Sequence, residues 1–112
     1  MERISYRKVR STQSAVFDII IALCRDYDRR NDAVKEERVS RRVRMEYMYI
    51  NTRMMSAAAE VAGSAIAEQF IREIGMGVGY AASKLDFISE SAYKAMKQRI
   101  KLKIAKRLYL TD

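Results

Sequence analysis

A hydroxyl, two ammonium groups and a carboxamide follow one another at Ser91, Lys94, Lys97 and Gln98. Groups of these types donate to and accept from base edges in the grooves of a DNA duplex. If the segment 89–108 is a helix, the four residues occupy its N-terminal half, which is the part that a recognition helix brings to the bases. We therefore predict that these four side chains read bases.

Four more residues near this segment are suited to the phosphate backbone of DNA. They are Lys84, Ser89, Lys101 and Lys103. Lysine neutralises phosphate charge, and a serine hydroxyl hydrogen-bonds to phosphate oxygens. Between Glu90 and Asp112 the chain has seven Lys or Arg residues and no acid, so the segment should attract a polyanion. The ordinary alternative is a solvated surface whose lysines only keep the protein in solution.

The segment 89–108 has the pattern of a capped helix. The Ser89 hydroxyl can accept a hydrogen bond from an amide of the following turn, and Glu90 suits the positive end of the helix dipole. Apolar residues then recur every four positions, which indicates one face packed on a core. They are Ala92, Met96, Ile100, Ile104 and Leu108. The opposite face is left for a partner.

The residues before this helix predict the rest of a helix-turn-helix at about 62–108. A helix over 62–74 has apolar residues spaced by four, and Gly75, Gly77 and Gly79 then interrupt it. A short helix over 80–85, with Ala81 and Ala82 allowing close packing, precedes a turn at 86–88. A connection of three or four residues is typical of the motif.

Four stretches of this region together resemble a known family. They are 69–74 (QFIREI), 81–85 (AASKL), 88–93 (ISESAY) and 99–108 (RIKLKIAKRL). They are similar to the C-terminal unit of phage late-gene transcriptional activators of the RinA and ArpU type, which themselves resemble region four of sigma factors. The resemblance covers about residues 66–110. It implies a helix-turn-helix regulator of transcription from a phage or mobile element.

Composition predicts one all-α domain, a bundle of four to five helices. The chain has 112 residues, no proline and only four glycines, with 49% hydrophobic residues. Its 22 basic and 14 acidic residues give a net charge of +8, which favours a polyanionic partner. We expect residues 1–13 to form a basic N-terminal arm and residues 14–112 a single helical domain.

Residue types argue against an enzyme, a metal site and a cofactor. Histidine is absent, and Cys24 is the single cysteine, so zinc sites, histidine-based triads and internal disulfides are disfavoured. We expect Cys24 to be buried in a reducing compartment. The longest apolar run, 19–24, is too short to cross a bilayer, and the start does not read as a secretory signal. The expectation is a cytoplasmic protein of a bacterial or phage-infected cell, with no membrane partner.

The first two-thirds of the chain predict further helices. One should begin near Ser14, another should run over 33–49, and Asn51 with Thr52 should cap a third. Residues 28–38 could be helix or loop, with any break at 31–32. A middle group of arginines is either a second phosphate-binding face or, slightly favoured, paired with nearby glutamates. The arginines are Arg38, Arg41, Arg42, Arg44 and Arg53.

These patterns favour a sequence-specific DNA-binding regulator of transcription that places the helix 89–108 in the major groove. Its partners would be double-stranded DNA, a second copy of the chain, since dimers are expected for useful affinity, and RNA polymerase as a further candidate. The main competitor is a small phage-encoded interaction protein or inhibitor that applies the same basic helix to an acidic protein surface.

Overall fold

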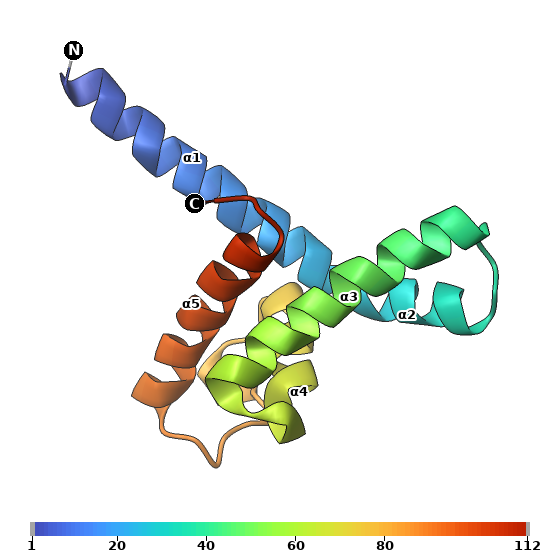
Figure 1. Ribbon diagram of the computed structural model, residues 1–112. Helices are drawn as coiled ribbons and strands as arrows, with labels where there is room; N and C mark the ends of the chain where they lie inside the picture. Colours follow the sequence, from blue (N-terminus) through green and yellow to red (C-terminus); the bar gives the residue numbers. More distant parts are fainter. Residues whose placement is uncertain (1, 112) are drawn as a thin grey trace.

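The computed structural model describes residues 2–111, and among these the side chains of residues 14–111. The described chain forms five α-helices and no strand (Figure 1). The helices are α1 (Glu2–Arg25), α2 (Tyr27–Lys35), α3 (Arg41–Ala62), α4 (Ser64–Met76) and α5 (Glu90–Arg107), with a short 3-10 turn, η1 (Tyr80–Ala82), before α5. The prediction of an all-α fold is confirmed.

The helices pack around α3, which contacts α2, α4 and α5, while α1 lies against α4 and α5. The first half of α1 extends past the other helices (Figure 1). We expected the first helix to begin near Ser14, but its backbone is already helical from Glu2. Residues 2–13 contain no proline or glycine, so no helix-breaking residue separates them from the rest of α1. The side chains of the expected basic arm, residues 1–13, lie outside the described part.

The core is built from apolar residues of α1, α3, α4 and α5. Its members include Ile20, Met54, Phe70, Ile71, Ile100 and Ile104, all without exposed surface. The expected apolar stripe of α5 is confirmed from Met96 onward, since Ile100 and Ile104 are fully buried and Met96 and Leu108 pack at the edge of the core. Ala92 is not part of the core cluster. Tyr93 of the same helix is also buried and stacks on Phe70 with ring centroids 5.5 Å apart.

α1 and α4 cross with almost no space between their backbones. A Cβ added to Gly75 would lie 2.5 Å from the Arg25 amide nitrogen and 2.6 Å from the Cys24 carbonyl carbon. Only glycine permits such an approach without displacing a helix. The crossing also covers Cys24, which is free and buried as expected, and burial raises the pKa of its thiol to about 12.

A buried arginine joins α2 to α3 and to the end of α1. Arg30 Nε donates to Asn51 Oδ1 over 2.7 Å, and a second nitrogen of its guanidinium donates to the Leu23 carbonyl over 2.6 Å. The Asn51 amide in turn donates to the Tyr27 carbonyl over 3.0 Å. Both side chains are almost completely buried, and their polar groups are satisfied by one another and by backbone, as burial requires.

The structure corrects three expectations for this part of the chain. Residues 27–35 are helix, so a break at 31–32 was wrong. α3 begins at Arg41 after the capping residue Ser40, so no helix runs over 33–49. Asn51 does not cap a third helix but lies inside α3, where it binds Arg30. A helix-capping residue type can equally serve as a buried partner, and only the tertiary contact distinguishes the two uses.

Candidate nucleic-acid interface

The N-terminus of α5 is capped as the sequence predicts. Ser89 is extended, at φ −61 and ψ 152, and its hydroxyl accepts a 3.3 Å hydrogen bond from the Ala92 amide. Glu90 lies in the first turn, where its charge complements the helix dipole. The Ser89 hydroxyl keeps its own proton free for donation while it accepts from the helix, so the cap and a phosphate contact are compatible.

Three of the four residues predicted to read bases lie on the outward face of α5. Ser91, Lys94 and Gln98 are all exposed, and they occupy successive turns of the helix. The Lys94 ammonium lies 3.6 Å from a carboxylate oxygen of Glu90, but both side chains are largely in water. Such an exposed pair is weak, so Lys94 remains accessible to a partner.

The fourth predicted base-reading residue, Lys97, points back to the protein. Its Nζ donates a 2.8 Å hydrogen bond to the Val78 carbonyl and lies 5.0 Å from the centre of the Tyr93 ring. Burial, with the charge of Lys101 nearby, lowers the pKa of Lys97. Its ammonium holds the loop before α5, and contact with a base would require that bond to break.

Two of the predicted backbone contacts also have partners within the protein. The Lys101 ammonium lies 5.0 Å from the centre of the Phe17 ring on α1, and burial lowers its pKa. Lys103 Nζ donates to Glu60 over 2.8 Å, and Arg107 bonds to the same carboxylate. These contacts attach α5 to α1 and α3. A lysine stem can lie along apolar surface while its ammonium group meets a neighbouring element. The spacing of lysines in the sequence does not show which neighbour that is.

The short second helix of the predicted helix-turn-helix is absent from the described structure. Residues 80–82 form only one 3-10 turn, and both Ala81 and Ala82 are exposed, so they bring no helices together. Leu85, at the end of this segment, is buried. The segment between α4 and α5 is therefore a loop with one 3-10 turn, without the short helix expected over 80–85.

A buried carboxylate organises this loop. Glu73 of α4 accepts hydrogen bonds of 2.6 Å from the Ser83 hydroxyl, 2.6 Å from the Tyr93 hydroxyl and 3.0 Å from the Lys84 amide. Gln69 supplies a further donor at 2.8 Å. In a helix over 80–85, the Lys84 amide would make the first i→i−4 hydrogen bond, but here it donates to the Glu73 side chain. A helix of only six residues is marginal without packing. The Lys84 side chain remains exposed.

α5 carries two exposed cations that were not among the predicted site residues. Arg99 is exposed beside Gln98, and Lys106 is exposed two turns further on. Together with Lys94 they leave three accessible positive charges along one helix. These cations are exposed because α5 packs on the core through Tyr93, Ile100 and Ile104. Tyr93 lies outside the set of apolar residues spaced by four, so that pattern alone did not define the packed face.

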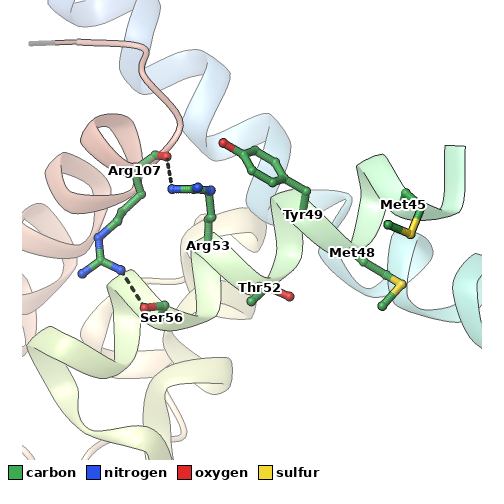
Figure 2. Close-up of a pocket in the computed structure, with 7 residues that line it drawn as sticks. All are labelled: Met45, Met48, Tyr49, Thr52, Arg53, Ser56 and Arg107. Atoms are coloured by element: carbon green, nitrogen blue, oxygen red, sulfur yellow. Dashed lines mark hydrogen bonds between the residues drawn. The ribbon is translucent and has the colours of Figure 1, made fainter. Parts of the chain in front are cut away.

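A second surface feature lies on α3, away from the predicted residues. A groove of about 500 Å³ is bordered by Met45, Met48, Tyr49, Thr52, Arg53, Ser56 and Arg107 (Figure 2). Arg53 donates to the Arg107 carbonyl over 3.3 Å, and Arg107 donates to the Ser56 hydroxyl over 2.6 Å. Met45 and Met48 are 60% and 48% exposed, which core-filling methionines are not.

Three of the five middle arginines pair with glutamates, which is the alternative that the sequence slightly favoured over a phosphate-binding face. Arg38 lies 2.8 Å from Glu36, Arg44 lies 3.4 Å from Glu37, and Arg42 lies 3.6 Å from Glu46. Glu60, a further glutamate of α3, pairs instead with Lys103 and Arg107 of α5.

Comparison of the chain with models of known protein families, with curated proteins and with solved structures finds no match. Within residues 2–111, no helix is both long and apolar enough to span a membrane. The described side chains likewise include no group of three or more Cys, Asp or Glu residues arranged to hold a metal ion.

Proposed function

We propose that the protein is a sequence-specific DNA-binding regulator of transcription, of phage or mobile-element origin, that inserts the first turns of α5 into the major groove. The observation that carries the proposal is the capped start of α5, with Ser91, Lys94 and Gln98 exposed on successive turns. The resemblance to phage late-gene activators supports the same use of this helix.

Base reading in this proposal rests on Ser91, Lys94 and Gln98, with Arg99 as an additional contact. Backbone contacts come from Lys84 and Ser89 at the loop, because these precede the helix and are exposed. Lys97, Lys101 and Lys103 act mainly by their charge and by holding α5 in place. A loop tied to Glu73 replaces the helix that normally supports a recognition helix.

The test is selection of a randomised duplex pool by the purified protein, followed by fluorescence anisotropy on the enriched sequence. The Lys94→Ala/Gln98→Ala variant should weaken binding to the enriched duplex by at least roughly tenfold, since each base contact is worth about 1–3 kcal/mol. Lys35→Ala, which removes an exposed lysine of α2, is the matched control and should leave the enriched sequence unchanged.

The competing function, binding of α5 to an acidic protein surface, predicts a different outcome. No sequence would be enriched, and DNA binding would fall with salt equally for all duplexes. The contacts of Lys97 and Lys101 within the protein are the observation that favours this competitor, because they leave fewer free ammonium groups for the series of phosphate contacts on which duplex binding depends.

A further inference from the structure

α3 carries an exposed stripe of apolar and hydroxyl side chains along the groove. Met45, Met48, Tyr49, Thr52 and Ser56 recur at spacings of three, one, three and four residues, which places them on one face of the helix. All five are exposed. Figure 2 shows them along α3 beside the groove. From Met45 to Ser56 the stripe is about 17 Å long at 1.5 Å per residue, enough for three turns of a second helix.

Methionine and tyrosine give this surface the character of a protein-binding site. Methionine side chains adapt to differing apolar partners, and tyrosine supplies apolar area with a polar end. The groove beside the stripe, about 500 Å³, can receive large side chains. An amphipathic helix that presents apolar residues at i, i+3 or i+4, and i+7 matches these features.

The charges beside the stripe decide which helix fits. Arg53 lies 4.4 Å from the centre of the Tyr49 ring and bonds to a backbone carbonyl, and none of the ion pairs among residues 14–111 includes it. At the same end, the single carboxylate of Glu60 is shared by Lys103 and Arg107. Among the described side chains, this end of the groove is therefore net positive.

A second copy of the chain fits less well than an acidic partner. In a parallel two-fold pairing of α3 with itself, the positive end of each stripe meets the same charge on its copy. In an antiparallel pairing that end meets Glu46, whose carboxylate already lies 3.6 Å from Arg42. Like charges across an interface cost affinity. A helix with carboxylates next to its apolar residues would instead meet Arg53 and Arg107 with opposite charge.

From these observations we propose that the stripe and groove of α3 bind an acidic amphipathic helix of another protein. The apolar side of that helix packs on Met45, Met48 and Tyr49, and its carboxylates pair with Arg53 and Arg107. The proposal is independent of DNA binding, because it uses α3 and the end of α5 rather than Ser91, Lys94 and Gln98.

The probe is a displayed library of helix-forming peptides, with one face varied among apolar residues and the flanking positions varied among Glu, Gln and Lys. Selection on the full chain should enrich apolar residues at helical spacing with Glu, and not Lys, at the flanks. Affinity of an enriched peptide is then measured by fluorescence anisotropy. Met45→Ser/Met48→Ser and Arg53→Gln should each weaken it by at least roughly tenfold.

Two controls keep the result specific. Lys94→Ala, on the outward face of α5, should leave the dissociation constant of the enriched peptide unchanged. Thermal unfolding should show that the methionine variant is folded, as expected for two exposed side chains. Peptides without acidic flanks, or equal binding by the methionine variant, overturn the proposal. A wild-type dimer in sedimentation equilibrium that Met48→Glu dissociates also overturns it, since the stripe then belongs to a second copy.

Discussion

The Tyr93 hydroxyl donates a 2.6 Å hydrogen bond to Oε1 of Glu73, so that α5 and α4 are joined by a polar contact within the core. The same carboxylate holds the loop through Ser83 and the Lys84 amide. One acidic side chain thus positions both the start of α5 and the segment that leads to it.

Removing this carboxylate should destabilise the protein. Glu73→Gln replaces an acceptor of four hydrogen bonds by a group with its own donors, and we expect a loss of about 2–3 kcal/mol in the free energy of unfolding, measured in urea. Tyr93→Phe removes one of the four bonds and should cost about half as much. Glu90→Gln, at an exposed position, is the control. Equal stability of Glu73→Gln and Glu90→Gln would contradict the role of Glu73.

Stability should fall with acidification below the ordinary pKa of a glutamate. Burial acts to raise the pKa of Glu73, but its hydrogen-bond donors outweigh that effect and hold the pKa below 4.5. A carboxyl whose folded-state pKa is depressed stabilises the fold above the unfolded-state pKa, and this contribution is lost as pH falls through the folded-state value.

The measurement is urea unfolding at a series of pH values from about pH 6 to pH 3. Glu73→Gln should show a shallower decline than the wild type. Asp26 and Glu60 also have lowered pKa values, through hydrogen bonds from Arg29 and Lys103 respectively, and they act in both proteins. The difference between the two curves therefore reports Glu73, and parallel curves would show that its ionisation does not affect folding.

Gly75→Ala should separate α1 from α4. Its new methyl group would lie 2.5 Å from a backbone nitrogen of α1, and backbone cannot move aside as a side chain can, so we expect a loss of about 1–3 kcal/mol. Gly79→Ala is the matched control, because nothing lies within 4 Å of its added Cβ; it should change stability by less than about 0.5 kcal/mol. Thermal and urea unfolding measure both.

Arg30→Ala should destabilise the protein far more than Arg29→Ala, although the two arginines are adjacent. Loss of Arg30 leaves the Asn51 side chain and the Leu23 carbonyl without their donors in a buried site, at a cost of about 3 kcal/mol. Arg29 pairs with Asp26 in water, and its loss should cost less than about 1 kcal/mol. Similar melting temperatures for the two variants would refute the buried contact.

Local signals on α5 were predictable from sequence. The cap at Ser89 uses only atoms of the next turn, and Ile100 and Ile104 repeat with the period of the helix, so neither depends on distant parts of the chain. The inward contacts of Lys97 and Lys101 could not be predicted. Each depends on a residue far away in sequence, Val78 or Phe17, and a lysine on an expected polar face gives no local sign of it.

Polar residues caused the main errors in the predicted fold. Asn51 was interpreted as a helix cap, and residues 31–32 as the place of any break in 28–38, because polar residues of this kind favour helix ends. In the structure Asn51 is buried against Arg30, and Asn31 contacts the Asn51 amide from within α2. In the predicted helix-turn-helix, Glu73 took the amide that a short helix would have used. Such competition between side chain and backbone is decided by tertiary contacts.

Arg53 connects the middle of α3 to the last turn of α5, and it lies 5.7 Å from the centre of the Tyr109 ring as well as against Tyr49. Any molecule that displaces Arg53 from between these rings therefore changes the surroundings of residue 109. The chain contains no tryptophan, so Tyr109→Trp would create a single indole whose emission responds to occupancy of the groove. The protein thus offers a position for an optical sensor of its own binding events, with no added dye.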